Sequence, residues 1–422
     1  MISYAQALAL LHSRAPRLPA ETAPLAEALG RTTAGEIRAE FAVPSFDNSA
    51  MDGFAVRLAD CQRASPEAPV VLPVAEVTAA GDQLSLLAAG HAVQIMTGAM
   101  LPAEAEAVYP IEDVAVARNA DGAVTAITLT SAPAPGANIR GKGEDFLPRD
   151  TLTGDATRLT SRHLMALAAL GVGSVPVRQR PYVSVLATGN EIRDAPAGQA
   201  NTTPGEAVIY NSNSPYLVAA LREAGARVEY GGIIPDTQAA FTTALEGIIA
   251  QARPGQIIVS TGAVSKGEFD FVPAALAALN AEILFHRVAI RPGKPVLFAM
   301  LANQIPFFGL PGNPASAAVG FRFFITPLLR AAWGLPPEPP LRVRLAATHQ
   351  ARPGLRIFLK AHLSIGADGA AAATILAGQE SFRVQPMLHI NGWVVRDETV
   401  GSLQAGELVD FYPADPFSSF FA

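Results

Sequence analysis

Short apolar runs alternate with helical patterns over about residues 178–333, and most of these runs end in a polar loop. Runs such as "YVSVLATGNE", "QIIVSTGAVSKGEFD" and "QIPFFGLPGNPAS" are typical of a strand followed by a loop, whereas "YLVAALREAG" and "AAFTTALEGIIAQA" have helical spacing. Strands that alternate with helices form parallel βαβ units, and strands this apolar suit a sheet that is covered on both faces. The pattern therefore predicts a doubly wound α/β domain.

The segments on either side of this domain have a β-rich pattern. Residues 41–130 carry short Val- and Ile-rich runs with frequent Gly and Pro, which predicts a small β domain. The chain begins with a helical pattern, and "LTSRHLMALAALG" predicts another helix after the β-rich region. The segment "GLPPEPP" predicts a stiff linker. Beyond it, runs such as "LRVRLAATHQ" and "NGWVVRD" predict a last small β domain.

Composition and charge narrow the functional classes. Half of the 422 residues are hydrophobic, which is enough for sizeable cores, yet no apolar run approaches the roughly 18 residues of a membrane span. The net charge of −6 does not indicate a nucleic-acid-binding surface, so positive charge for an anionic ligand has to be local. The one cysteine, Cys61, excludes a disulfide framework within the chain and a Cys-rich zinc site. We expect a cytoplasmic protein with no membrane or nucleic-acid partner.

Four loops of the α/β domain follow the carboxyl ends of its strands, where open α/β sheets bind their ligands. They contain "ATGNE", "IPDT", "STGAVSKGEFD" and "GLPGNPAS". In the last loop, Asn313 can cap a helix that Pro314 starts, and the glycines leave backbone N–H groups uncovered. A P-loop is not present, because Glu268 and Phe269 follow Gly267 where Lys and Ser or Thr are needed. Together the loops predict an anionic ligand at this edge of the sheet.

Charged residues near these loops suggest what the ligand is. Cations suited to a phosphate-like oxyanion lie in the third loop and in "FHRVAIRPGKP", namely Lys266, Arg287, Arg291 and Lys294. Mg²⁺ binds a few carboxylates together with substrate phosphate oxygens. Acids that suit it are Asp47, Asp52, Glu144, Asp145, Glu191, Asp236, Glu268 and Asp270. The seven histidines show no HExxH or paired spacing, which argues against a dedicated zinc site.

Several long motifs of this chain resemble the molybdopterin molybdenumtransferase family, of the MoeA and gephyrin E-domain type. The motifs are "PSFDNSAMDGFAV", "IMTGAMLPAEAEAVYPIED", "NIRGKGEDF", "LATGNEI", "IYNSNSPYL", "STGAVSKGEFDF", "VAIRPGKPVLF" and "FGLPGNPAS". They occur in the expected order between about residues 1 and 334. The chain after the linker matches the family only in its β-rich texture.

The resemblance implies a fold, a reaction and partners. The fold is a multidomain α/β protein with a discontinuous domain I (1–40 and 141–177), an inserted β-rich domain II (41–140), a molybdopterin-binding domain III (178–333) and a C-terminal β-barrel domain IV (338–422). The reaction is insertion of molybdate into the dithiolene of adenylylated molybdopterin (molybdopterin-AMP), with release of AMP and with Mg²⁺ or a similar divalent metal ion. The resemblance also implies a homodimer whose site lies between domain III and the partner subunit. Molybdopterin adenylyltransferase and molybdoenzyme chaperones are further candidate partners.

The resemblance assigns candidate roles by position in the motifs. The implied catalytic residues are Asp52, Thr97, Asp145, Glu191, Asp236 and Asp270, and the last three are also the candidate metal ligands. The implied contacts of the molybdopterin phosphate are Thr188, Gly189, Ser260, Thr261, Gly262, Ser265, Lys266, Gly267, Pro311, Gly312 and Asn313. Molybdate is expected at Arg287, Arg291, Lys294 and Ser381, helped by a domain IV cation that stays open among Arg352, Arg356 and Lys360.

This chain also departs from the family pattern, and other functions remain open. Asn190 stands where Asp is usual, Ala263 replaces a Gly, and Arg291 replaces a common Lys. One alternative is an adenylyltransferase that acts one step earlier, although its fold resembles domain III alone. Another is a non-catalytic scaffold or sensor that binds molybdopterin, which the Asn190 departure makes worth testing. Tungstate would fit as molybdate does, because the two oxyanions have nearly the same size and charge.

Overall fold

The computed structural model describes residues 1–198, 203–262, 271–351 and 353–417. The chain divides into two compact units. The first unit consists of residues 1–35, 155–161 and 174–422, and the second of residues 36–154 and 162–173. Within the described part of the chain, none of the helices combines the length and the hydrophobicity that a membrane span requires.

A six-stranded sheet forms the centre of the first unit, in the order β16-β13-β17-β21-β20-β18. Its strands are β13 (Tyr182–Thr188), β16 (Arg227–Ile234), β17 (Gln256–Gly262), β18 (Glu282–His286), β20 (Leu297–Leu301) and β21 (Ile305–Pro311). The neighbours β16, β13, β17 and β21 run parallel, whereas β20 and β18 extend the sheet in antiparallel pairs. The predicted parallel sheet is therefore confirmed, and its carboxyl ends meet at one edge.

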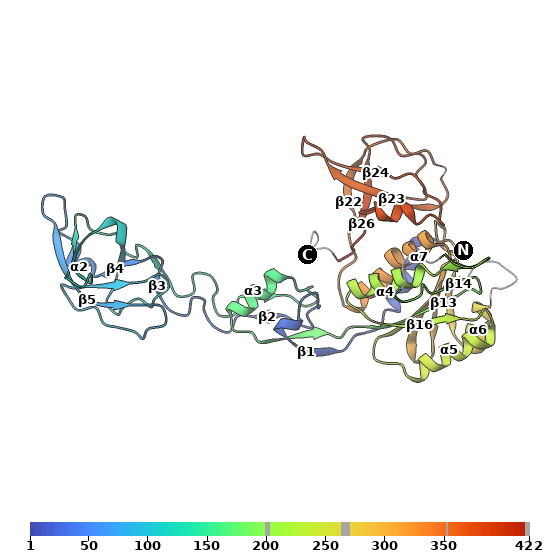
Figure 1. Ribbon diagram of the computed structural model, residues 1–422, viewed down its shortest axis with the longest axis horizontal. Coiled ribbons are helices and arrows are strands. Elements are labelled where there is room, and N and C mark those ends of the chain that lie inside the picture. The colour runs from blue at the N-terminus through green and yellow to red at the C-terminus, as the bar shows by residue number, and fades with distance from the viewer. Residues whose placement is uncertain (199–202, 263–270, 352, 418–422) are drawn as a thin grey trace. The chain divides into compact units, whose positions relative to one another are not determined.

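Helices cover both faces of this sheet (Figure 1). One face packs against α4 (Asn213–Glu223), α7 (Pro314–Gly320), α8 (Thr326–Ala332) and the N-terminal α1 (Tyr4–Ser13). The other packs against α5 (Gln238–Ala250) and α6 (Val272–Ala278). Thr237 caps α5, because its hydroxyl accepts a hydrogen bond from the Ala240 N–H at 3.3 Å. The helix α1, which was expected in domain I, packs into the core of the α/β sheet. The boundaries of the four domains stay a prediction.

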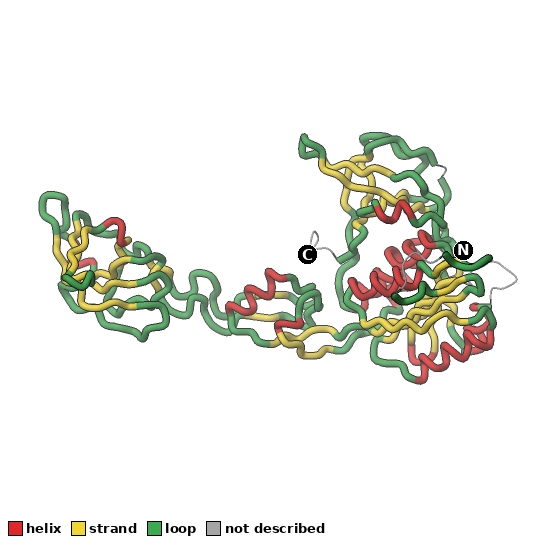
Figure 2. The backbone as a smooth tube through the Cα atoms, in the orientation of Figure 1, coloured by secondary structure: helices red, strands yellow, loops and turns green. Residues whose placement is uncertain are grey.

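The chain after the linker forms a closed five-stranded barrel (Figure 2). Its strands are β22 (Leu341–Leu345), β23 (Arg356–Ile365), β24 (Ala371–Ile375), β25 (Gly392–Arg396) and β26 (Leu408–Pro413). Pairing runs around the ring, and the pair of β23 with β25 closes it. The short strand β19 (Ile290–Arg291) of the α/β domain also pairs with β23. The predicted C-terminal barrel is confirmed.

A buried ion pair joins the linker to the α/β domain. Arg322 lies in the helical turn η4 (Phe321–Ile325) and donates to Glu338 of the linker at 2.6 Å. Its Nε also donates to the Pro413 carbonyl oxygen of the barrel at 2.8 Å. Both charged side chains are almost fully buried, so this contact joins the helical turn to the linker and to the last strand of the barrel.

The second unit contains a curled six-stranded sheet in the order β7-β4-β6-β5-β9-β8. Its strands are β4 (Gly53–Val56), β5 (Val70–Thr78), β6 (Ala92–Ile95), β7 (Ala107–Pro110), β8 (Ala115–Arg118) and β9 (Val124–Leu129). Cys61, at the end of α2 (Leu58–Cys61), is buried in its core. The unit also contains the predicted helix, α3 (Ser161–Ala169), and two short strand pairs. The β-rich pattern of residues 41–130 is thus explained by one sheet.

Candidate functional site

A cavity of about 740 Å³ opens at the carboxyl ends of the parallel strands in the first unit. The strand-end loops predicted from the sequence supply much of its lining. Of the expected residues, those that line it are Thr188, Gly189, Glu191, Asp236, Thr261, Gly262, Pro311, Gly312 and Asn313. Ser260 instead lies buried within β17 and does not line the cavity. The remaining expected loop residues, Ser265, Lys266, Gly267 and Asp270, lie outside the described residues, as does Ala263.

Glycines let the ends of the strands approach one another closely. Gly262 has a φ of +133°, and a Cβ there would lie 2.2 Å from the Thr188 hydroxyl and 2.4 Å from the Thr188 carbonyl oxygen. Gly189 has a φ of +142°, with the Glu191 carboxylate beside it. Any larger residue at these positions would collide with its neighbour or strain the backbone. The close approach of the strand ends at the cavity therefore requires glycine at both positions.

Asn213, which the sequence did not single out, connects three of the elements around the cavity. Its side-chain amide donates to the Thr261 hydroxyl at 3.0 Å and to the Gly312 carbonyl oxygen at 2.8 Å. It is also the first residue of α4. Its only signal in the sequence was its place in the motif "IYNSNSPYL". At the helix that follows Gly312, Asn313 occupies the N-cap position, but its side chain makes no capping hydrogen bond.

Asp236 has one carboxylate oxygen that is held by a hydrogen bond and one that has no partner among the described residues. Its Oδ2 accepts a hydrogen bond from the Asn190 N–H at 2.9 Å. Its Oδ1 is buried and accepts no hydrogen bond from the described residues. A buried carboxylate oxygen without a donor is costly, so it favours a cation or a ligand donor at this point. Asp236 and Glu191 thus offer two carboxylates at one cavity.

The described residues do not complete a metal site by themselves. Over the described ranges, no group of three His, Cys, Asp or Glu side chains is arranged to hold a metal ion. The third expected ligand, Asp270, belongs to the segment that is not described. The predicted site therefore has two of its three carboxylates on the cavity wall.

The three expected molybdate cations flank the cavity instead of lining it. Arg291 and Lys294 are exposed, and Arg287 adopts a left-handed φ of +85°. Their loop packs against α7, because a Cβ on Gly293 would lie 3.6 Å from the Ser316 carbonyl oxygen. Ser316 and Pro295 do line the cavity, so the cationic loop is its direct neighbour.

A loop of the barrel forms another wall of the same cavity. Phe382 and Val384 line it, although their side chains are 63% and 45% exposed. The expected residue Ser381 contacts α7 through its carbonyl oxygen, which accepts from the Ala315 N–H at 2.9 Å. The sequence did not indicate Phe382 and Val384, because nothing in the alternating pattern of the barrel shows which loop faces the α/β domain.

Lys360 holds this barrel loop in place. It is 1% exposed, and its ammonium group donates to the carbonyl oxygens of Gly378 at 2.7 Å, Glu380 at 3.1 Å and Arg383 at 3.4 Å. Burial lowers the pKa of Lys360. Arg356 is instead paired with Asp397 and Glu398, and Arg352 lies outside the described residues. Among the three domain IV cations that the sequence offered as candidates, Lys360 is therefore the one that supports the cavity wall.

Replacement of Lys360 by methionine is expected to loosen this wall. Hydrogen bonds from a charged donor contribute about 1.5–3 kcal/mol each, so we expect the amide of Ala315, which donates to Ser381, to exchange with solvent about 10-fold faster or more. Hydrogen exchange followed by mass spectrometry measures this. The control is Arg344→Met, an exposed barrel arginine that donates to the Gly406 carbonyl oxygen. Equal exchange at Ala315 in both variants would show that Lys360 does not hold the loop.

The other expected residues belong to the second unit. Asp52 accepts hydrogen bonds at 2.7 Å from both the N–H and the hydroxyl of Thr97. Both hydrogen bonds lower the pKa of Asp52 and so keep its carboxylate ionised, and the bond from the Thr97 N–H has the larger effect. Asp145 is exposed, and its N–H donates to the Val43 carbonyl oxygen. The structure thus brings Asp52 and Thr97 together, in a different unit from the cavity.

The sequence matches two family models. Residues 2–171 match the MoeA N-terminal region (domain I and II), and residues 184–331 match a probable molybdopterin binding domain. A molybdopterin molybdenumtransferase of Synechococcus elongatus is 38% identical over 370 residues, which cover 86% of this chain and 88% of the relative. The molybdopterin molybdenumtransferase of Haemophilus influenzae is 34% identical over 397 residues, which cover 92% of this chain and 92% of the relative.

Solved structures agree over the whole chain. The crystal structure of a molybdopterin biosynthesis MoeA protein from Pyrococcus horikosii superposes with a TM-score of 0.79 at 31% identity, covering 98% of this chain and 99% of that one. A second MoeA structure, from Pyrococcus horikoshii OT3, superposes with a TM-score of 0.78 at 27% identity. It covers 97% of this chain and 99% of that one. The order of the motifs, the α/β sheet and the terminal barrel all agree with these matches, and the chain belongs to the molybdopterin molybdenumtransferase family.

Proposed function

We propose that this protein acts in molybdenum cofactor biosynthesis as a molybdopterin molybdenumtransferase, which inserts molybdate into the dithiolene of molybdopterin-AMP and releases AMP. The observation that carries the proposal is the cavity of about 740 Å³, where glycine backbone and two carboxylates meet beside a cationic loop. A nucleotide-linked pyrophosphate needs close backbone contact, and a metal oxyanion needs cations. This cavity and its neighbouring loop offer both.

The backbone at Gly189, Gly262 and Gly312 would bind the phosphates of the substrate, with Asn213 fixing the relative position of the loops. Ser265, Lys266 and Gly267 stay candidates for the same contacts, whereas Ser260 is buried within β17 and would support the strand behind them. Mg²⁺ would be held by Glu191, Asp236 and Asp270, where it would neutralise phosphate charge as AMP leaves. The unpartnered oxygen of Asp236 fits such a cation.

Molybdate would be held by Arg287, Arg291 and Lys294 together with Ser381. Guanidinium groups bind tetrahedral oxyanions through paired N–H donors, and an ammonium adds a point charge. The sulfur ligands belong to the substrate, so the protein supplies position and electrostatics. Phe382 and Val384 give the cavity an apolar wall on which the pterin ring system can lie.

The active protein would be a cytoplasmic homodimer with the four domains expected from the motifs. In that arrangement Asp52, Thr97 and Asp145 of the second unit would complete the site from the partner subunit. The ionised state of Asp52, held by the two hydrogen bonds of Thr97, supports a role toward a cationic or proton-donating group. Molybdopterin adenylyltransferase would supply the substrate, and molybdoenzyme chaperones would take the product.

Release of AMP from molybdopterin-AMP tests the proposal. We expect the purified protein to release AMP only when molybdate is added, and Lys294→Ala to lower this rate by about 100-fold, as the loss of a charge-stabilising donor does. The control is Arg342→Ala, an exposed arginine of the barrel. Formation of molybdopterin-AMP from ATP would instead indicate an adenylyltransferase, and binding without AMP release would indicate a scaffold. A parallel titration with tungstate compares the two oxyanions.

A further inference from the structure

A second hollow of the first unit, of about 380 Å³, lies between α5 and the sheet. Its floor comes from the amino ends of β13, β16 and β17, which begin at Tyr182, Arg227 and Gln256. The cavity of the proposed reaction lies at the carboxyl ends of the same strands. The two openings therefore belong to opposite edges of one sheet.

The hollow exists because the packing between α5 and the sheet changes character along the strands. Toward the carboxyl ends, Leu186 and Ile258 pack against α5 in a closed apolar core. Two residues earlier on the same face, Ser184 and Gln256 replace them, and they are only 6% and 8% exposed. Gln256 Nε2 donates to the Ser184 hydroxyl at 3.1 Å, so the floor is polar and ordered.

The helix leaves room above this floor. Ala244 and Gly247 of α5 line the hollow, and a Cβ on Gly247 would meet no atom within 4 Å. Large apolar side chains usually fill the space between a helix and a sheet. Small-molecule sites combine a mostly apolar lining with a few placed polar groups, and Ser184 and Gln256 supply such groups here. The volume of the hollow also lies in the range of such sites.

Positive charge gathers at the mouth of the hollow. The guanidinium carbons of Arg227 and Arg253 lie 5.4 and 4.7 Å from the centre of the Tyr182 ring, and Arg227 donates to the Tyr182 hydroxyl at 2.7 Å. Among the described residues, neither arginine has a carboxylate within ion-pair distance. Close by, burial and then the charges of Arg31 and Arg227 lower the pKa of Arg180.

The acidic residue of the lining is Glu229, which is exposed and shares a strand face with Arg227. It offsets part of the positive charge. The lining has two guanidinium groups, of Arg227 and Arg253, and one carboxylate, so the net charge at the mouth of the hollow is positive. Glu229 would also accept a hydrogen bond from a ligand hydroxyl or ammonium group.

We propose that this hollow is a second ligand site, which binds the oxyanion group of a compact metabolite between Arg227 and Arg253. Guanidinium forks match the paired oxygens of a carboxylate or a phosphate. The rest of the ligand would lie on the floor formed by Ser184 and Gln256, beneath Gly247. The site needs no residue of the proposed transferase reaction.

Titration calorimetry on the full chain tests the site. Inorganic phosphate and malonate are the two separate probes, because the oxyanion of the ligand is either a phosphate or a carboxylate. We expect at least one probe to bind, and the double variant Arg227→Gln/Arg253→Gln to weaken that binding about 10-fold or more, because both charge-assisted hydrogen bonds to the oxyanion are lost. Arg222→Gln, an exposed change on α4 across the sheet, should bind as wild type does. Binding that the double variant leaves unchanged belongs to another site and overturns the proposal.

Gly247→Leu tests the same site without a change of charge. The leucine fills the hollow and favours the helix, so the fold should be kept while probe binding weakens. This variant decides the question if the arginine variant does not fold. Unchanged binding in Gly247→Leu, or no binding of either probe to the wild-type protein, also overturns the proposal. Both variants should keep molybdate-dependent AMP release.

Discussion

Replacement of Arg322 by methionine is expected to lower the free energy of unfolding by about 3–5 kcal/mol. The side chains of Arg322 and its partner Glu338 are 3% and 6% exposed. Methionine keeps much of the packing but leaves the Glu338 carboxylate buried without a cation, and it frees the Pro413 carbonyl oxygen that Arg322 binds. The expected loss is large because water cannot replace the missing donors at this depth.

Urea unfolding, followed by circular dichroism, measures this change. The matched control is Arg342→Met, because the pair of Arg342 with Asp410 is exposed and should contribute no more than about 1 kcal/mol. The double variant Arg322→Met/Glu338→Met removes both charges and should recover most of the stability. If Arg322→Met shifts the midpoint no more than Arg342→Met does, the buried pair does not hold the linker.

Replacement of Asp236 by asparagine is expected to lower molybdate-dependent AMP release by about 10–100-fold, the usual effect of a change at a metal site. Asparagine can still accept the hydrogen bond from the Asn190 N–H, so the loop should keep its shape. The buried second oxygen is replaced by an uncharged NH₂ group, which is a hydrogen-bond donor and cannot bind a divalent cation. The proposed role of Asp236 therefore predicts an effect on metal binding and not on folding.

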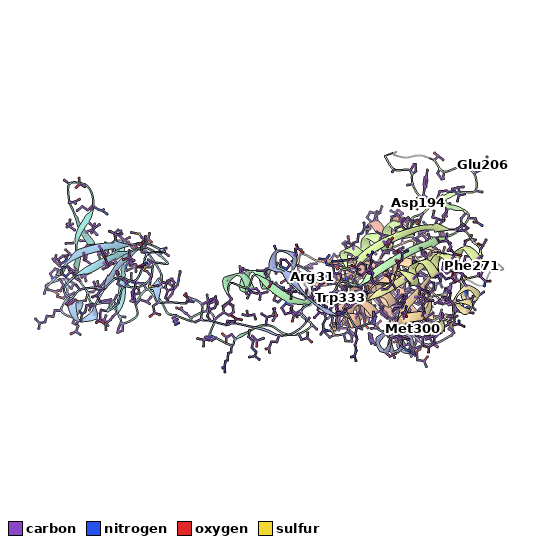
Figure 3. All side chains as sticks on the ribbon, turned by 90° about the horizontal axis from the view of Figure 1, so that it is seen from below. Arg31, Asp194, Glu206, Phe271, Met300 and Trp333 are labelled. Atoms are coloured by element: carbon purple, nitrogen blue, oxygen red, sulfur yellow. The ribbon has the colours of Figure 1, made fainter. Side chains whose placement is uncertain are left out.

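The readout is the Mg²⁺ concentration that gives half-maximal AMP release, together with Mn²⁺ binding measured by electron paramagnetic resonance. Both should shift by about 10-fold or more in Asp236→Asn. Glu206→Gln is the matched control, because Glu206 is an exposed carboxylate that does not line the cavity (labelled in Figure 3). Wild-type Mn²⁺ affinity in Asp236→Asn would remove Asp236 from the metal site.

Much of the cavity could be predicted because its parts are local. Parallel strands place their carboxyl ends at one edge, so the ends of β13, β17 and β21 had to lie side by side. Gly189 and Gly262 are needed where backbone segments approach closely, and Thr237 caps a helix within three residues of itself. These requirements are visible in a short stretch of sequence.

Other parts could not be predicted, because they depend on contacts between distant segments. Asn213 binds Gly312, which lies 99 residues away, and Arg322 binds Pro413, 91 residues away. Lys360 was one of the candidate cations for molybdate, but the closed barrel buries it beneath the loop that carries Ser381. Arg287, Arg291 and Lys294 were expected at the ligand, and the structure places them beside the cavity.

The sequence alone determined the family, the doubly wound sheet, the terminal barrel and the edge at which the ligand is expected, because periodicity and long motifs act through neighbouring residues. The tertiary structure decided which side chains face the cavity, which cation is structural and where polar residues beneath a helix leave a second hollow. Packing and burial arise only when segments far apart in the chain meet, so their consequences for charge and hydrogen bonding follow from the folded protein.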